Sequence, residues 1–332
     1  MGNTLKATPA EVVLETRDLV RHFQGKRRHF LGRKTTIRAV DGVSFTLHQG
    51  ETLGLVGESG CGKSTVGKVI LNILQPTSGR VFYRGRDISA LKAAAEPSLH
   101  REMQMIFQDP LGALDPRMRV GDQICEPHAI FRIGTEKDRK QAACEMLDLM
   151  GLKAHIYTRY PHELSGGQQQ RVVIARALIL RPKVVVCDEP ISALDVSIKA
   201  QVINLLSKLQ DMLGVAYLFI SHDLSAVRHI CSRIAVMYLG QVVEMAERTD
   251  LFSTPLHPYS KALISAVPVP DPSVRRNRII LTGEPPSPID PPSGCRFHTR
   301  CPIAQPVCSE VVPSLRTFGN GHTVLCHFPG EA

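Results

Sequence analysis

Apolar and polar positions alternate at the start of the chain, a pattern that predicts β-strands. Segments VVLETRDLVRHF (12–23) and AVDGVSFTL (39–47) have the period-two pattern of half-buried strands, and TLGLV (52–56) is a short apolar run. Between the first two lies a basic insert, QGKRRHFLGRKTTIR (24–38). We expect this insert to be a solvated loop between strands; a patch that faces nucleic acid or lipid is the alternative.

Strands and helices alternate further along the chain. The runs VVVCD (184–188) and AYLFISH (216–222) are continuously apolar, as in buried parallel strands, and SIKAQVINLLSKLQDML (197–213) has helical periodicity. Residues 101–160 lack strong strand signals and contain a helical stretch, EKDRKQAACEMLDLMG, which should end at Gly151. The pattern therefore predicts an α/β core into which a helical subdomain, at about residues 101–165, is inserted.

A change in composition marks the last quarter of the chain. After His257 prolines accumulate in VPVPDPS, GEPPSPIDPPSG and CPIAQPVC. We place a boundary near residue 255, which divides the 332 residues into a domain of residues 1–255 and a small Pro/Cys-rich domain of residues 256–332.

Composition and charge exclude some classes of protein. With 43% apolar and 21% charged residues the chain is of the ordinary globular type, not a disordered one. It has no run of ~18–20 apolar residues and no leader pattern at its start, so we expect it to be neither embedded in a membrane nor exported. The net charge of +9 favours nucleotide phosphates, an anionic membrane surface or nucleic acid, and does not choose among them.

The segment GESGCGKST (57–65) has the composition and the context of a phosphate-binding loop. It follows the apolar strand TLGLV and precedes the helical run VGKVILNIL. Its glycines let successive backbone N–H groups point at phosphates from a helix N-terminus, and Lys63 adds a positive charge. Ser64 can offer a hydroxyl to Mg²⁺. The residues expected to bind ATP here are Gly57, Glu58, Ser59, Gly60, Cys61, Gly62, Lys63, Ser64 and Thr65.

Two adjacent carboxylates, Asp188 and Glu189, come at the end of the buried strand VVVCD. In a parallel sheet this end lies on the same side as the phosphate-binding loop. We expect Asp188 to hold Mg²⁺ and Glu189 to accept the proton of the water that attacks the γ-phosphate. By itself such a pair is an ordinary end of a strand; together with the loop it predicts a catalytic site.

The segment LSGGQ (164–168), followed by QQRVVIARAL, narrows the choice of protein families to which the chain can belong. It resembles the signature of ABC ATPases, which few other classes with a phosphate-binding loop possess. Its residues Leu164, Ser165, Gly166, Gly167 and Gln168 form a second helix N-terminus able to bind a γ-phosphate, although the chain already has one. The resemblance implies that this second site serves the ATP of an opposing subunit in a head-to-tail dimer.

Other elements of that family occur in the expected order. Gln108 in IFQDP, Asp195 in SALD and His222 in ISHDL resemble the Q-loop, the D-loop and the switch histidine. The resemblance implies that Lys63, Gln108, Glu189 and His222 are catalytic and that Ser64, Gln108 and Asp188 hold Mg²⁺. Phe23 stands where members of the family often place an aromatic ring on adenine; a buried strand residue is the alternative.

The resemblance extends past the ATPase core. The segments RYPHELSGGQ, HPYSKALISAVP and GEPPSPIDPPSGC are similar to those of the peptide and nickel importer ATPases, above all the F-type subunit of dipeptide or oligopeptide permeases. The resemblance implies a P-loop ABC ATPase core with an antiparallel β subdomain, a helical subdomain and a small C-terminal domain. It also implies a heterodimer with a homologous ATPase, two membrane permeases and an extracytoplasmic peptide-binding protein, at the cytoplasmic face of the bacterial inner membrane.

Four of the nine cysteines crowd the end of the chain, at Cys295, Cys301, Cys308 and Cys326. Their spacing is not the C-x-x-C pattern of many zinc sites. Four thiolates could hold a [4Fe–4S] cluster, as the resemblance suggests, or a Zn²⁺ ion, or they are free thiols. His298 and His327 are further candidate ligands.

Three other functions compete with the import of peptides. A nickel or other small-solute importer ATPase of the same group is the nearest, because the binding protein and the permeases select the substrate. A soluble ABC ATPase of translation or DNA repair is less compatible with one phosphate-binding loop, one signature and no extended heptad run. An intact Glu189 and His222 argue against a regulatory subunit without turnover, and we expect no nucleic-acid partner.

Overall fold

The structure is a computed structural model that describes residues 11–27, 34–91, 96–268 and 278–331. A four-stranded antiparallel sheet in the order β2-β1-β4-β5 forms one side of the N-terminal half. Its strands are β1 Val12–Arg27, β2 Lys34–His48, β4 Ser78–Tyr83 and β5 Arg86–Asp87. The predicted antiparallel β subdomain is thus present.

The second sheet has eight strands in the order β11-β12-β10-β9-β3-β8-β7-β6. The strands from β9 to β6 are parallel, and β10, β12 and β11 add to one edge in antiparallel orientation. Their bounds are β3 Thr52–Val56, β6 Met103–Ile106, β7 Val184–Asp188, β8 Ala216–Ser221, β9 Arg233–Tyr238, β10 Gln241–Glu247, β11 Leu315–Phe318 and β12 His322–Leu325. The predicted parallel α/β core is confirmed.

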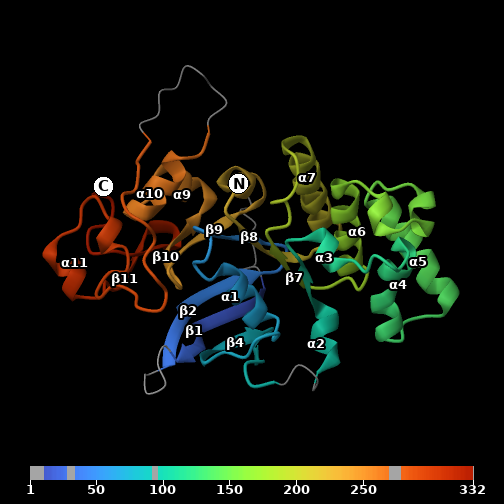
Figure 1. Ribbon diagram of the computed structural model, residues 1–332, viewed down its shortest axis with the longest axis horizontal. Helices are drawn as coiled ribbons and strands as arrows, with labels where there is room; N and C mark the ends of the chain where they lie inside the picture. The colour runs from blue at the N-terminus through green and yellow to red at the C-terminus, as the bar shows by residue number, and fades with distance from the viewer. Residues whose placement is uncertain (1–10, 28–33, 92–95, 269–277, 332) are drawn as a thin grey trace, which may run out of the picture.

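Helices cover this sheet and extend from it toward one end of the molecule, where α4 and α5 lie (Figure 1). The helices are α1 Lys63–Ile70, α2 Pro97–Glu102, α3 Pro110–Ala113, α4 Val120–Ile130, α5 Glu136–Leu149, α6 Gly166–Leu178, α7 Val196–Leu213, α8 Leu224–Ile230, α9 Arg248–Ser253, α10 Pro258–Ser265 and α11 Pro306–Glu310. Thr135 and Asp138 form a capping box at the start of α5. After α5, Gly151 has a φ of 66°, which ends the helix where the sequence predicts.

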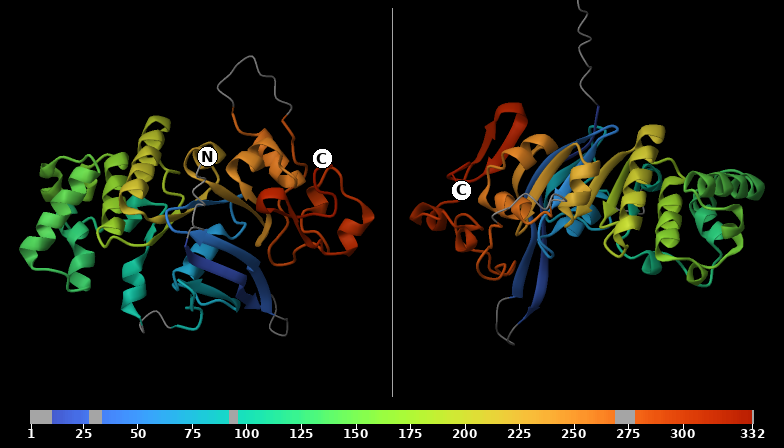
Figure 2. Two further views of the ribbon diagram at one scale, coloured as in Figure 1. Left: turned by 180° about the vertical axis from the view of Figure 1, so that it is seen from behind. Right: turned by 90° about the horizontal axis from the view of Figure 1, so that it is seen from above.

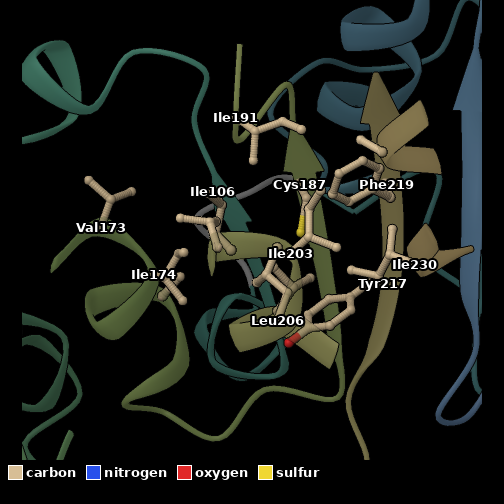
Figure 3. Packing of buried hydrophobic residues seen from close by; sticks show 14 of the residues in the cluster. Ile106, Val173, Ile174, Cys187, Ile191, Ile203, Leu206, Tyr217, Phe219 and Ile230 are labelled. Carbon is tan, nitrogen blue, oxygen red and sulfur yellow. The ribbon is translucent and has the colours of Figure 1, made fainter. Parts of the chain in front are cut away.

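Of the two apolar core clusters among the described residues, one includes residues of α1 and of the antiparallel sheet, and the other lies between the parallel strands and helices α6 and α7. Figure 3 shows Ile203 and Leu206 of α7 beside Cys187 of β7 and Tyr217 of β8, all within one buried cluster. Leu206 and Tyr217 are both inaccessible to solvent. Burying a side chain of the size of leucine contributes about 1.5–3 kcal/mol, so this layer stabilises the strand ends that carry Asp188 and Glu189.

Two expectations about local structure are wrong in part. The basic insert is not a loop over its described residues, because β1 continues to Arg27 and β2 starts at Lys34, with Gln24 paired to Thr36; residues 28–33 lie outside the described part. Residues Met103–Ile106 form strand β6 at the edge of the core sheet, so the helical subdomain does not begin at residue 101. Four residues are too few for periodicity to reveal a strand.

The C-terminal segment is joined to the core sheet. Strand β12 pairs with β10, through Glu244 opposite Val324, and β11 forms the edge of the sheet. Figure 2 shows this segment and α11 at the end of the molecule opposite α4 and α5. The division at residue 255 stays a prediction; the proline-rich stretch before the cysteines lies partly outside the described residues, at 269–277.

Candidate nucleotide site

The loop Gly57–Gly62 bends sharply between β3 and α1. Gly57 and Gly62 have φ angles of 151° and 108°, and a Cβ atom on Gly62 would lie 1.9 Å from the carbonyl oxygen of Ala39. Only glycine fits at such a position, because both the backbone angle and the available space exclude a side chain. Helix α1 then starts at Lys63. The loop therefore has the shape that a phosphate-binding turn requires.

Lys63 folds back over the loop. The residue is only 4% exposed. Its ammonium group donates to the carbonyl oxygens of Gly57 at 2.8 Å and Glu58 at 2.9 Å. The thiol of Cys61 lies 3.7 Å from the same nitrogen and is buried, which raises the pKa of that thiol. The predicted cation is thus held within the loop.

Ser64 and Asp188 meet across the sheet. Strand β8 separates β3 from β7, yet the Ser64 hydroxyl at the start of α1 donates to Asp188 Oδ1 at 2.7 Å. Burial raises the pKa of Asp188, and the hydrogen bond from Ser64 acts in the opposite direction. A hydroxyl and a carboxylate at this distance are hard oxygen donors of the kind that Mg²⁺ prefers.

Glu189 contacts two other residues of the predicted site, Gln108 and His222. Gln108 Nε2 donates to Glu189 Oε2 at 3.0 Å, and His222 Nδ1 lies 3.1 Å from Glu189 Oε1. The three side chains come from the ends of β6, β7 and β8. Glu189 itself has a φ of 48°, a conformation that costs a non-glycine residue about 1–3 kcal/mol and is frequent at functional sites.

Phe23 lies on β1, half-buried, with the guanidinium of Arg21 4.7 Å from its ring centroid. The neighbouring His22 and Asp41 are joined by a 2.9 Å contact between Nε2 and Oδ1. Phe23 is therefore not enclosed in the core, and its role at adenine stays a prediction.

Two of the signature residues face outward, whereas Leu164 is buried. Ser165 and Gly166 are exposed at the start of α6, where Ser165 caps the helix in a capping box with Gln168. Gly167 packs against α7, because a Cβ atom there would lie 2.7 Å from Ile198 Cγ2. Asp195, also exposed, precedes α7. The signature and Asp195 thus share an open surface, and none of the hydrogen bonds found among the described residues joins the signature to the chain's own phosphate loop.

The four C-terminal cysteines line one small pocket. Cys295, Cys301, Cys308 and Cys326 surround it together with His298, His327 and apolar side chains such as Ile303 and Phe328. Burial raises the pKa of Cys295 to about 11 and also raises the pKa values of Cys301 and Cys326. Within the described ranges no three His, Cys, Asp or Glu side chains lie close enough to share one metal ion.

Two contacts to the loop were not anticipated from the sequence. The guanidinium of Arg300 pairs with the Glu58 carboxylate, and the Tyr259 hydroxyl accepts a hydrogen bond from the Glu58 N–H. Tyr259 belongs to the HPY segment that the sequence marks as distinctive, whereas no local pattern marks Arg300.

Comparison with known proteins gives two family matches. Residues 40–192 match the family described as "ABC transporter", and residues 243–308 match "Oligopeptide/dipeptide transporter, C-terminal region". The chain is 48% identical to the oligopeptide transport ATP-binding protein AppF of Bacillus subtilis, over 97% of this chain and 99% of AppF. It is 50% identical to the oligopeptide transport ATP-binding protein OppF of Salmonella typhimurium, over 95% and 96%.

Solved structures share the fold of the N-terminal part. CbiO1 of Clostridium perfringens, part of the transporter complex CbiONQ, has a TM-score of 0.63 and 26% identity, over 73% of this chain and 91% of CbiO1. The dimeric cassette MJ0796 of an ABC transporter has a TM-score of 0.63 and 26% identity, over 71% and 98%. None of the described helices is long and apolar enough to cross a membrane.

Proposed function

The chain belongs to the ABC transporter ATPases that carry the oligopeptide/dipeptide C-terminal region, and from this premise we propose that it is the ATP-hydrolysing subunit of an importer of dipeptides or oligopeptides. One observation carries the proposal: Gln108 and His222 both contact Glu189 at the edge of the sheet where Ser64 contacts Asp188. The names of the relatives, which are oligopeptide transport proteins, support peptides as the cargo.

The residues of the loop divide the work of binding the phosphates. The N–H groups of Gly60, Gly62 and their neighbours, at the start of α1, bind phosphate oxygens, and Lys63 turns its ammonium group toward them. Ser64 and Asp188 would hold Mg²⁺, with Gln108 nearby, and the ion when bound would neutralise charge on the phosphates. Phe23 stacks on the adenine ring.

Glu189 acts as the general base. Its carboxylate accepts the proton of the attacking water, while the contacts with Gln108 and His222 fix its orientation. Phosphoryl transfer needs little covalent help from a protein, so the position of these groups and of Lys63 supplies most of the catalysis. His222, which is exposed at the end of β8, can also contact the γ-phosphate.

The open surface of the signature would be completed by a second ATPase. Ser165, Gly166 and Gly167 present a helix N-terminus to solvent next to Asp195, where the γ-phosphate of an opposing subunit can bind. We therefore propose a head-to-tail heterodimer with a homologous ATPase. Binding of ATP closes this dimer, and hydrolysis reopens it.

A groove beside Gln108 provides a surface for the membrane permeases. It has a volume of about 220 Å³ and is lined by side chains from β6, α4 and α6, among them Phe107, Ile130 and Phe131. Phe107 is 46% exposed and Ile130 is 67% exposed. Large apolar side chains at a surface mark a docking site for another protein. Two permeases docked in this way would hold the ATPase at the cytoplasmic face of the inner membrane, and an extracytoplasmic binding protein would deliver the peptide.

We also propose that the cysteine pocket holds a [4Fe–4S] cluster in preference to Zn²⁺. Its four thiols converge from separate turns, yet they do not lie close enough to share a single ion. Four cysteine thiolates are the ligand set of such a cluster, and Cys295, Cys301, Cys308 and Cys326 would supply them. Iron, sulfide and zinc analysis of anaerobically purified protein tests this. Zinc alone, or neither metal, would overturn it.

Reconstitution tests the principal function. The chain, co-expressed with the ATPase, permeases and binding protein encoded beside it, should form a complex whose ATPase rate rises when the binding protein carries an oligopeptide. Lys63→Ala should remove nucleotide binding and stimulation. Stimulation by nickel instead of peptides would assign the alternative importer, and a solitary ATPase stimulated by nucleic acid would overturn the transporter proposal.

A further inference from the structure

The turn between Cys295 and Cys301 reaches the phosphate loop. Its residue Arg300 places Nη1 2.8 Å from Glu58 Oε2 and Nη2 3.0 Å from Glu58 Oε1. This two-pronged pair is the strongest geometry that an arginine can form with a carboxylate. The Arg300 side chain is 7% exposed and that of Glu58 is 29% exposed, so solvent reaches the pair only from the side of the carboxylate.

A second side chain of the C-terminal region holds the same loop residue. The hydroxyl of Tyr259 accepts from the Glu58 N–H at 2.9 Å. Its ring is inaccessible to solvent and packs against Tyr238 and Phe297, with centroids 4.8 and 5.4 Å away. Because two neighbouring aromatic rings fix its position, Tyr259 presents a rigid acceptor to the loop.

The internal support of the loop is temporary. Lys63 at present donates to the carbonyl oxygens of Gly57 and Glu58. When its ammonium group turns toward phosphates, these bonds weaken and the first half of the loop loses its partner within the loop. The contacts of Glu58 with Arg300 and Tyr259 do not involve Lys63, so they stay in place when the Lys63 ammonium group moves. They keep a glycine-rich segment, which otherwise has high conformational entropy, in its bent shape.

The same turn also contacts the adenine side of the site. Arg296 donates to the carbonyl oxygen of Leu239 and pairs with Asp41, which in turn contacts His22 next to Phe23. The Cys295–Cys301 turn therefore touches the phosphate loop and also Asp41 of β2, which in turn contacts β1, the strand that carries Phe23. If Arg300 served only to anchor the C-terminal segment, it would not need to pair with Glu58, a residue of the phosphate loop.

We propose that Arg300 and Tyr259 are positioning residues of the nucleotide site, which hold Glu58 so that the phosphate loop keeps its binding shape. This inference rests on the proposed ATPase function and adds to it a source of affinity for nucleotide within the C-terminal segment. The position of the Cys295–Cys301 turn thereby sets how tightly the chain binds nucleotide.

Titration of the full-length chain with a fluorescent ADP analogue tests the inference, because ADP probes the chain's own loop without the partner's signature. Arg300→Gln should weaken binding about ten-fold and Tyr259→Phe about three-fold, as expected for the loss of a charged and of a neutral buried hydrogen bond. Arg300→Lys, which keeps the charge but not the fork, should lie between Arg300→Gln and the parent. The control Arg316→Gln removes an exposed arginine of β11 and should change nothing.

A second substitution separates positioning from simple neutralisation of charge. If Arg300 only cancelled the charge of Glu58, then Glu58→Gln would restore the affinity of Arg300→Gln. If Arg300 positions the loop, the double variant should remain about ten-fold weaker than the parent. In the assembled transporter, KM for ATP should rise about ten-fold while kcat changes less than about two-fold.

Each outcome decides one question. Unchanged ADP binding in Arg300→Gln, or restored binding in the double variant, overturns the positioning role. A thermal unfolding scan of each variant identifies loss of the fold, and Tyr259→Phe, which keeps its ring packing, then serves as the deciding variant. Failure of the parent chain to bind ADP would instead refute the proposed ATPase function.

Discussion

The helical end of the molecule and its C-terminal end flank the same sheet but relate differently to the nucleotide. At the helical end the signature residues Ser165 and Gly166 are exposed and aimed at solvent. At the C-terminal end Arg300 and Tyr259 are buried and contact Glu58 of the chain's own loop. In the dimer proposed above, the first end receives the nucleotide of a second subunit, whereas the second end already contacts the loop of its own chain.

This difference separates two kinds of contribution to one reaction. Contacts made by the C-terminal end exist before any partner arrives, so they act on binding of nucleotide by the single chain. In the proposed dimer the signature makes its contacts only with the partner's nucleotide, so these contacts should act on closure and hydrolysis. Substitutions at the two ends should therefore change different measured quantities, with the catalytic centre between them as the reference.

The largest effect is expected at that centre, with Glu189→Gln. Loss of a general base lowers the rate by 10²–10⁴-fold, and we expect a fall of about 10³-fold in ATP hydrolysis. The amide keeps the shape of the side chain and an acceptor for Gln108, so ATP should still bind and should trap a closed dimer visible by size-exclusion chromatography. Hydrolysis at the parental rate would show that Glu189 is not the base.

Ser165→Arg should lower hydrolysis by the assembled transporter about 10²-fold, because it blocks the helix N-terminus that the partner's γ-phosphate would enter. Binding of the ADP analogue by the single chain should not change. The control Gln141→Arg adds the same charge to an exposed position of α5 and should leave both quantities unaltered. A loss of ADP binding in Ser165→Arg would remove the contrast between the two ends.

The two ends also differ in how much of them the sequence predicts. The loop Gly57–Thr65, the strand end at Asp188 and the exposed signature were predicted, because each depends on a short, contiguous pattern. The contact of Arg300 with Glu58 was not, because it joins residues 242 positions apart, and no local pattern records which distant carboxylate a guanidinium meets. Strand β6 was missed for a related reason: its four residues are a strand only because β7 lies beside them.

The C-terminal end holds a buried histidine whose titration should make the fold less stable in acid. His257 is fully buried at the start of α10, its Nδ1 accepts from the Tyr259 N–H, and burial lowers its pKa from an ordinary 6.5 to about 4. At pH values between about 4 and 6.5, His257 is protonated in the unfolded chain but not in the folded chain. The free energy of unfolding should therefore fall by about 2 kcal/mol from pH 6.5 to about pH 5.

His257→Asn separates this titration from those of its neighbours. An asparagine keeps an acceptor for the Tyr259 N–H but does not titrate, so the variant should lose most of the change in stability, measured by denaturant unfolding at each pH. Glu244, which accepts from the His257 N–H, and His322, which contacts Glu244, remain in both proteins and cancel in the comparison. His155→Asn, at an exposed position of the helical end, is the control. An equal pH dependence in His257→Asn and the parent would contradict the assignment.

An effect smaller than those above is expected at Phe23, with Phe23→Ala. Removal of a stacking ring costs about 1 kcal/mol, so affinity for the ADP analogue should fall about five-fold. Phe23→Tyr keeps the ring and should bind like the parent. Phe23 adjoins the contacts among His22, Asp41 and Arg296. If the Cys295–Cys301 turn supports the two halves of the site independently, the losses of affinity for the ADP analogue in Phe23→Ala and Arg300→Gln should add in the double variant. Unchanged affinity in Phe23→Ala would instead make it an ordinary strand residue and leave Glu58 as the one point where the C-terminal end acts on nucleotide binding.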